Sequence, residues 1–298
     1  MRLRRWVTVA GAALTAMALT LVTGSVAEAG VYGGPGGPRE VRGYIEQAYV
    51  QRYGGPNGVL GGPTTDEIAT PRRVGAFNHF ANGSIYWSPG TGAWKVAGAI
   101  RSGWAATGWE SGPLGFPVAD ERRLPGGWWQ PFEGGKMMFS PASGSQPVSG
   151  WFFGLYAAYG NEAGALGYPT SAEIPLVRGG VGQQYQGGLM YASPDSRGAH
   201  VVRGAILGVW GSIGYERGSY GYPRTEERRN ADGEYYQNFV GGTIVWNVRY
   251  GSLTLQDFID CDDTIWTPAD FQDFFAIWGD QYGDVYDLDP DGNGIACG

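Results

Sequence analysis

The sequence has few of the residues on which several common function classes depend. Its 298 residues include two cysteines and two histidines, and 28 acidic side chains outnumber 21 basic ones for a net charge of -7. No block of Lys and Arg is present, which argues against nucleic-acid binding, because that affinity comes largely from cations that neutralise phosphates. No Walker, dinucleotide-binding, His-Glu-x-x-His or Gly-x-Ser-x-Gly motif occurs, and His79 and His200 occupy unmatched positions. We therefore predict no catalytic residue and no enzymatic activity.

Long apolar runs are also rare, and the longest lies at the N-terminus. Arg4 and Arg5 precede an uncharged apolar run over residues 6–22, and Ala-Glu-Ala at residues 27–29 provides a cleavage site before Gly30. This pattern predicts a secretory signal peptide over residues 1–29. The alternative, a membrane anchor, needs about 20 apolar residues and no cleavage site. No later run is long enough to span a bilayer, so we expect a secreted protein, extracellular or cell-wall associated, with no transmembrane span.

Glycine, by contrast, is abundant. The chain has 53 glycines, roughly 18% against about 7% in average proteins, so it should be rich in turns and poor in long helices. Its hydrophobic content of 43% and aromatic content of 14% are too high for a disordered chain. Eleven Asp lie between Asp257 and Asp291, where Lys, Arg and His are absent. This charge asymmetry indicates two units with different roles.

Five sequence features recur four times in a fixed order. A Gly-x-Pro turn ends in Pro63, Pro117, Pro169 and Pro223. A glutamate stands four residues later, at Glu67, Glu121, Glu173 and Glu227. An aromatic residue with glycine three positions on follows as Phe80/Gly83, Phe132/Gly135, Tyr185/Gly188 and Phe239/Gly242. The next feature is an apolar pair, Ile85-Tyr86, Met137-Met138, Met190-Tyr191 and Ile244-Val245. Upstream lie pairs at helical spacing, Ile45/Tyr49, Ile100/Trp104, Phe152/Tyr156 and Ile206/Trp210.

This order predicts an α+β repeat protein whose units each contain a short helix, a Gly-Pro turn and a hairpin. The four repeats cover about residues 41–96, 97–148, 149–202 and 203–255, after a Gly/Pro-rich linker at residues 30–40. A unit this small cannot bury its apolar surface alone, so neighbours must complete its core. Open stacks need polar capping repeats, but the outer units are as apolar as the inner ones. We therefore expect closure into a disc with pseudo-fourfold symmetry.

The tetrapeptide Leu114-Gly115-Phe116-Pro117 and the segment from Phe239 to Trp246 are similar to the LGFP repeat family of actinobacteria. The resemblance covers about residues 41–255, although Gly62 and Tyr220 depart from its pattern. It implies an exported protein whose repeats associate with the cell envelope, sometimes beside an enzyme domain.

The repeated glutamates are the main candidates for chemistry, because paired carboxylates carry out glycoside hydrolysis. A cell-wall hydrolase that uses them is therefore one alternative function. However, four equivalent carboxylates are better explained as structural. In Thr64-x-x-Glu67 and Thr170-x-x-Glu173 the spacing is that of a helix capping box.

Aromatic residues outside the repeated positions are candidates for binding. Exposed indoles stack on the C–H faces of sugar rings, although tryptophan also fills loop-rich cores. The candidates for glycan binding are Trp94, Trp109, Trp128, Trp129 and Trp151. We expect an envelope polysaccharide or peptidoglycan as partner; an adaptor that binds a partner envelope enzyme would use the same surface.

The acidic tail has the composition of a Ca²⁺ loop, with oxygen ligands and glycine at a tight turn. One register uses Asp289, Asp291, Asn293 and the Ile295 carbonyl; the other uses Asp287, Asp289, Asp291 and the Asn293 carbonyl. In the second register, the ligand at the twelfth position, normally Glu, falls on Gly298, whose terminal carboxylate is our candidate substitute.

Residues 288–297 resemble the Excalibur domain, which implies a small extracellular Ca²⁺-binding module with an EF-hand-like loop over about residues 256–298. That family usually has Glu where Gly298 stands. Cys261 and Cys297 are the only cysteines, and an extracellular setting favours a disulfide between them. Between them, residues 267–278 predict a helix with Phe271, Phe274, Phe275 and Trp278 on one face.

Overall fold

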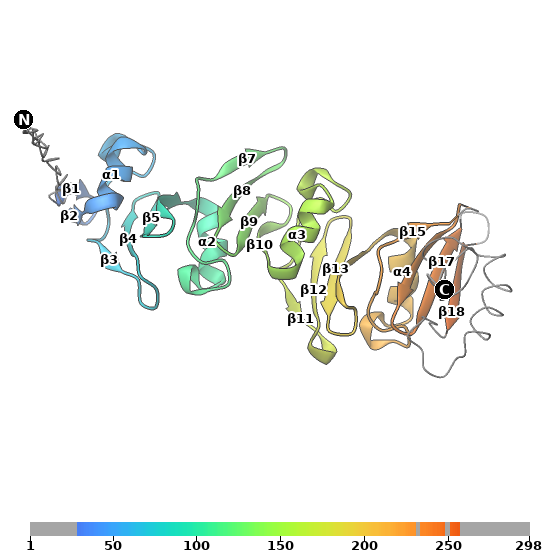
Figure 1. Cartoon of the computed structure of the whole chain (residues 1–298). Helices are drawn as coiled ribbons and strands as arrows, with labels where there is room; N and C mark the ends of the chain where they lie inside the picture. The colour runs from blue at the N-terminus through green and yellow to red at the C-terminus, as the bar shows by residue number, and fades with distance from the viewer. Residues whose placement is uncertain (1–28, 231–232, 248–250, 257–298) are drawn as a thin grey trace, which may run out of the picture.

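The computed structural model describes residues 29–230, 233–247 and 251–256, with side chains given up to Ser252. The predicted signal peptide, Cys261, Cys297 and the predicted Ca²⁺ ligands therefore lie outside the described residues, apart from Ala29. The described part consists of four successive units that follow one another along the molecule (Figure 1). Each unit has one helix and one four-stranded antiparallel sheet, which confirms a repeat protein built from a helix and a hairpin-based sheet.

Each repeat begins with a helix of nine residues. These helices are α1 (Gly43–Gln51), α2 (Gly98–Ala106), α3 (Gly150–Ala158) and α4 (Gly204–Ser212). A one-turn 3-10 helix follows each of them, as η1 (Gly55–Asn57), η2 (Trp109–Ser111), η3 (Asn161–Ala163) and η5 (Tyr215–Arg217). The third repeat has a further short element, η4 (Val177–Gly179), between its first two strands.

The strands of each repeat pair with their neighbours in chain order. The first sheet contains β3 (Ile68–Ala69), β4 (Ala76–Phe80), β5 (Gly83–Ser88) and β6 (Gly92–Val96). The second contains β7 (Arg122–Leu124), β8 (Gly127–Phe132), β9 (Gly135–Ser140) and β10 (Gly144–Ser149). The third contains β11 (Ile174–Pro175), β12 (Val181–Tyr185), β13 (Gly188–Ser193) and β14 (Gly198–Val202). The fourth contains β15 (Arg228–Arg229), β16 (Tyr235–Phe239), β17 (Gly242–Asn247) and β18 (Gly251–Gln256).

The Gly-x-Pro turn is fixed by the helix that precedes it. The tetrapeptide glycines have φ between 62° and 68°, a left-handed conformation that glycine adopts without a side-chain clash. In the second repeat the indole Nε1 of Trp104 donates to the carbonyl of Gly115 at 3.1 Å. In the first, the Tyr49 hydroxyl donates to the Gly61 carbonyl at 2.8 Å. The second residue of each helical pair is aromatic, and it therefore holds the turn as well as filling the core.

The apolar pair lies on the third strand of each sheet. In the first three repeats it connects one repeat to the next. Successive side chains on a strand point to opposite faces, so Ile85 packs into the core beneath α1 while Tyr86 packs against the helix of the second repeat. The rings of Tyr86 and Trp104 meet edge to face at 4.6 Å. The third repeat repeats this contact, with Tyr191 against Trp210 at 4.7 Å. Each of the first three sheets thus lies between its own helix and the following one.

A buried amide side chain strengthens each connection. Gln130 donates from Nε2 to the carbonyl of Lys95 in the first repeat, at 2.7 Å, and to that of Ala119 in its own repeat, at 2.9 Å. The equivalent residues are Asn78, Gln183 and Gln237, each with two such bonds and each 1% exposed or less. These amides fix the spacing between neighbouring units.

The predicted closed disc is wrong, because the four units form an open row (Figure 1). None of the four core clusters of the described residues joins the first repeat to the fourth. The physical reason is the apolar pair. One of its side chains packs against the helix of its own repeat and the other against the helix of the next repeat, so the packing contacts continue along the chain. Closure is unnecessary for burial within this arrangement.

The segment expected as a linker at residues 30–40 instead forms a hairpin, β1 (Gly30–Gly34) and β2 (Gly37–Val41). The Tyr32 ring meets the Tyr49 ring edge to face at 5.3 Å, and its hydroxyl donates to Glu46 at 2.7 Å. Asn78 bonds to the carbonyl of Glu40 on β2 as Gln130 does to the last strand of the previous repeat. The hairpin therefore covers α1 in place of a preceding sheet.

Candidate functional site

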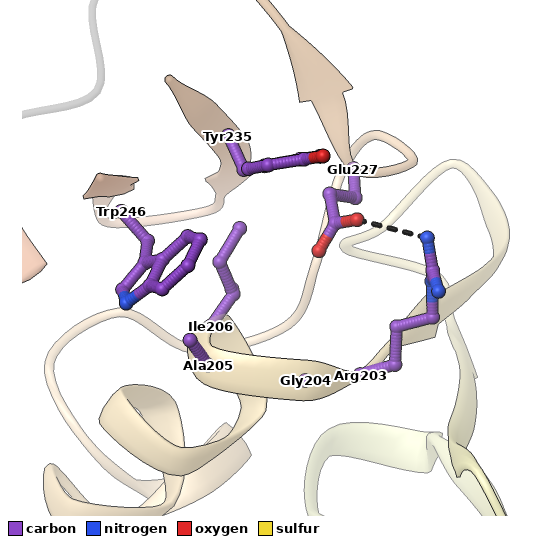
Figure 2. A pocket seen from close by; sticks show the side chains of 7 residues that line it. All are labelled: Arg203, Gly204, Ala205, Ile206, Glu227, Tyr235 and Trp246. Carbon is purple, nitrogen blue, oxygen red and sulfur yellow. Dashed lines mark hydrogen bonds and ion pairs between the residues drawn. The ribbon is translucent and has the colours of Figure 1, made fainter. Parts of the chain in front are cut away.

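A hollow of about 370 Å³ opens at the N-terminal end of α4 in the fourth repeat. Figure 2 shows Trp246 and Tyr235 on one side of it, the Arg203 and Glu227 side chains on the other, and Ile206 between them. Gly204 and Ala205 complete its lining. The hollow therefore combines two aromatic rings with one cation and one anion.

The two aromatic rings come from neighbouring strands. Trp246 stands two residues after Ile244 on β17, so both face α4. Tyr235 on β16 is its direct partner across the strands, and the ring centroids are 5.9 Å apart. Because cross-strand neighbours on one face lie close together, the two rings form a continuous aromatic wall.

The charged side of the hollow is an ion pair. Nη2 of Arg203, the residue immediately before α4, donates to Oε1 of Glu227 at 3.0 Å. The Glu227 side chain is 15% exposed and that of Arg203 is 40% exposed. Both partners therefore keep donor or acceptor atoms that a polar ligand can reach, and a pair of this kind recognises hydroxyl groups from both sides.

The repeated glutamates do not form the capping boxes expected from the sequence. Residues 64–67 and 170–173 are not helical, so no helix N-terminus exists there for the glutamate to cap. Instead the carboxylates turn toward the start of the helix in their own repeat. Ser149, the residue before α3, donates to Glu173 at 2.9 Å, as Arg203 does to Glu227. The spacing was right for a capping box but the backbone around it is not helical.

Burial affects two of these glutamates in the same direction. It raises the pKa of Glu67, an effect that Arg42 partly opposes, and it raises the pKa of Glu121, which Lys95 partly opposes. Each carboxylate belongs to a different repeat. Of the residues that line the hollow, Glu227 is the only carboxylate, whereas glycoside hydrolysis needs a pair of them.

The first repeat has the same position filled. There Trp87 is the equivalent of Trp246, and the residue equivalent to Ala205 is Tyr44. The Tyr44 and Trp87 rings are stacked, with centroids 5.5 Å apart and planes 11° apart. The chain's own tyrosine therefore stacks on the ring whose equivalent in the fourth repeat lines the hollow.

The five tryptophans proposed from the sequence do not share one environment. Trp151 is 63% exposed and Trp128 is 37% exposed. Trp109 and Trp129 pack against the cores of the second and third repeats, and Trp94 lies beneath the Arg52 guanidinium at 4.3 Å. Sequence analysis missed Tyr235, Trp246 and Arg203. The available signal was Ala205, which is small where another repeat has a large ring.

A second cluster of aromatic rings, between the second and third repeats, is already occupied. The Nζ of Lys136 lies 4.6 Å from the Tyr156 ring centroid and 5.5 Å from that of Phe153, and it donates to Asn161. Lys136 is only 7% exposed, and burial lowers its pKa to about 8. This enclosure holds the chain's own cation.

The described residues contain no group of three or more His, Cys, Asp or Glu side chains able to hold a metal ion. They also contain no helix that is long and apolar enough to cross a membrane. The six predicted calcium ligands lie outside these residues, so calcium binding stays a prediction.

The solved structures similar to this chain include two of an extracellular domain from B. thetaiotaomicron. One is described as part of a putative one component system and the other as part of a putative hybrid two component system. The first is 10% identical over 69% of this chain, with a TM-score of 0.16, and the second is 11% identical over 66%, with a TM-score of 0.15. This chain covers 26% and 24% of those chains. Likenesses this low define neither its fold nor its function.

No curated protein matches the sequence. The family model described as "LGFP repeat" matches residues 60–112, 114–164, 166–218 and 221–259. Each match begins at the glycine of a Gly-x-Pro turn or one residue before it, 16 or 17 residues after the start of the helix that opens the structural repeat. The helix of the next unit is therefore counted with the preceding sheet. The four matches cover more than half of the chain, and the protein therefore belongs to the LGFP repeat family.

Proposed function

We propose that the protein is a secreted, non-enzymatic binding protein of the cell envelope, and that the hollow in its fourth repeat recognises a wall polymer, a glycan. LGFP repeats suggest association with the cell envelope. The observation that carries the proposal is the pairing of the Trp246 and Tyr235 rings with the Arg203–Glu227 ion pair around one hollow. Ligand sites combine apolar walls with a few placed polar groups in the same way.

A pyranose ring matches this arrangement chemically. Its C–H face packs on an indole or phenol ring, while its hydroxyls donate to the carboxylate and accept from the guanidinium. The volume of about 370 Å³ falls at the lower end of the range for small-molecule sites, about 300–1,000 Å³. The hollow is therefore suited to one sugar unit or two within a longer polymer.

The alternative of a wall hydrolase is less well supported by the site. Its mechanism needs a second carboxylate beside Glu227, and the hollow's lining provides none. An adaptor that binds a partner envelope enzyme would also use exposed aromatic residues. An adaptor would bind a partner protein and not the wall polymer, whereas a hydrolase would cleave the polymer that it binds.

The test is a pull-down of the full-length mature protein on purified wall polysaccharide and on purified peptidoglycan. We expect retention of the wild type on the polysaccharide and loss of retention for Trp246→Ala. Trp151→Ala is the matched control, because it removes a more exposed indole outside the hollow. Retention of both variants would contradict the assignment of the hollow. Capture of a partner from protein lysate without retention on either wall fraction would favour an adaptor, and polymer turnover lost in Glu227→Gln would favour a hydrolase.

We also propose that residues 256–298 form a calcium-binding module closed by a Cys261–Cys297 disulfide. The alternation of Asp with glycine at residues 287–294 supports it. Calorimetric titration with Ca²⁺ tests it: Gly298→Glu should tighten binding, since it restores a bidentate ligand at the twelfth position. Binding that is absent in the wild type, or unaffected by Asp289→Ala, would contradict the site.

A further inference from the structure

The aromatic wall of the hollow leads across the sheet to a further cation, Arg229. Tyr235 pairs with Trp246 of β17 on one side and with Arg229 of β15 on the other. Side chains directly opposite one another on neighbouring strands share a face of the sheet. The three residues therefore form a row across three strands, on the face where Tyr235 and Trp246 pack against the core beneath α4.

Two contacts hold the Arg229 guanidinium at the end of this row. Its Cζ lies 5.5 Å from the Tyr235 ring centroid, which is within the range of a cation–π contact. Its Nε donates to the carbonyl of Gly233 at 3.2 Å. The residue is exposed, and within the described part of the chain neither of its Nη atoms has a carboxylate partner. The guanidinium is therefore positioned by the protein but keeps donors that a ligand can reach.

The charges around the hollow leave Arg229 as the cation that is not neutralised. Arg203 is paired with Glu227 at 3.0 Å. Glu226 and Glu234 also lie close in the sequence, but they accept hydrogen bonds from side chains that do not line the hollow. The whole chain carries a net charge of -7, so long-range attraction does not bring a polyanion to this surface. An anion that binds here must be recognised locally.

We propose that the glycan recognised by the fourth repeat is acidic, and that Arg229 binds a carboxylate or phosphate group on the sugar next to the one in the hollow. This inference rests on the proposed function, because it names the ligand class of the same site. Arginine binds both kinds of anion through two parallel N–H donors. One sugar ring packs on the aromatic wall, and its neighbour in the polymer places its anionic group beyond Tyr235.

The other repeats lack this combination of groups. At the position of Arg229 the first and third repeats have small or apolar residues, Ala69 and Pro175. The second repeat has Arg123, whose Cζ lies 5.5 Å from the Trp128 ring centroid. However, Ala97 stands before its helix where Arg203 stands before α4, so the second repeat lacks the ion pair. Arg123 therefore provides a matched control, with the same charge over an aromatic ring.

Binding isotherms of the full-length mature protein with purified wall polysaccharide test the proposal. The polymer is used in three forms: untreated, carboxyl-reduced with carbodiimide and borohydride, and dephosphorylated with hydrofluoric acid. We expect Arg229→Gln to weaken binding of the untreated polymer at least fivefold. One of the two treatments should weaken wild-type binding to the same extent, and it identifies the anion as carboxylate or phosphate. For that treated form Arg229→Gln should bind as the wild type does, because the contact is already absent.

The control variant separates local recognition from the loss of one positive charge. Arg123→Gln should leave binding of the untreated polymer within twofold of the wild type. Equal losses in Arg123→Gln and Arg229→Gln would show a general effect of charge and overturn the proposal. Equal binding of all three polymer forms by the wild type would overturn it as well.

Trp246→Ala distinguishes failure of this proposal from failure of the proposed function. If Trp246→Ala abolishes binding while Arg229→Gln and both treatments leave it unchanged, the hollow binds a neutral glycan and only the acidic class is wrong. If Trp246→Ala leaves binding of the untreated polymer unchanged, the hollow is not the site and both proposals fail.

Discussion

The first and fourth repeats have a tryptophan at equivalent positions of the same backbone arrangement, and they differ in whether another ring is stacked on it. In the first repeat Tyr44 is stacked on Trp87 at 5.5 Å. In the fourth, Ala205 leaves the equivalent Trp246 to line an open hollow beside Tyr235. The cross-strand partner of the tryptophan differs as well, since it is Ala76 in the first repeat and Tyr235 in the fourth. Under the proposed function, recognition is confined to one repeat while the scaffold repeats four times.

The largest expected effect comes from making the fourth repeat resemble the first. In Ala205→Tyr the new ring should stack on Trp246 as Tyr44 does on Trp87 and fill the hollow. We expect binding to wall polysaccharide to fall at least tenfold, about 1.4 kcal/mol or more, with no loss of thermal stability. A binding isotherm measures this, and Ala99→Tyr at the same helix position of the second repeat is the matched control. Unchanged affinity in Ala205→Tyr would mean that the hollow is not the site.

The reverse change in the first repeat should affect stability and not binding. Tyr44→Ala removes a stacked ring from Trp87, and such aromatic pairs contribute about 0.5–1.5 kcal/mol. We expect the free energy of unfolding to fall by about 1 kcal/mol in chemical denaturation, while polysaccharide binding stays at the wild-type level. Val50→Ala, an exposed residue of the same helix, is the control for a general effect of truncation. Loss of polymer binding in Tyr44→Ala would reverse the roles assigned to the two repeats.

The smallest expected effect concerns the repeated glutamate. Glu227→Gln removes the ion pair with Arg203 and should destabilise the protein by less than about 1 kcal/mol at pH 7, since the pair is partly exposed. Glu67 differs, because burial raises its pKa above the usual 4.5. Its folded state holds the proton more tightly than the unfolded state, so stability declines as pH rises from about 4.5 through the raised pKa.

Glu67→Gln abolishes that decline. Relative to the wild type, this variant should be slightly more stable at pH 7 and equally stable at pH 4. Denaturation curves at the two pH values compare both variants. The contrast between the repeats fails if Glu67→Gln and Glu227→Gln shift stability in the same direction at pH 7.

Much of the repeat could be predicted from the sequence because its signals are local. The helical spacing of Ile100 and Trp104 and the glycine of each Gly-x-Pro turn depend on neighbouring residues alone, and the structure confirms both. The disc was wrong because the apolar pair Ile85-Tyr86 does not show by itself which helix covers each face. The packing of Tyr32 against α1 was also not predicted, because a short Gly/Pro-rich segment resembles a linker.

The candidate site was harder to predict because it depends on differences between repeats. Trp246 occupies a position where a tryptophan also occurs in the first repeat, so it was counted as part of the repeated framework. Trp246 lines a hollow together with Ala205, which lies 41 residues earlier in the sequence and has no polar side chain. Trp109 is the opposite case. The sequence suggested it as a glycan-binding residue, but its ring packs against that of Trp104 with centroids 5.3 Å apart.

The central claim is that the fourth repeat binds the wall polymer through Trp246. The most direct measurement is an NMR titration of the mature protein, labelled with ¹⁵N at its tryptophans, with soluble fragments of purified wall polysaccharide. The Nε1–H signal of Trp246, assigned with Trp246→Phe, should shift progressively and saturate, while that of Trp87 stays in place under Tyr44. A saturable shift of Trp87 or Trp151 with Trp246 unmoved would contradict the account.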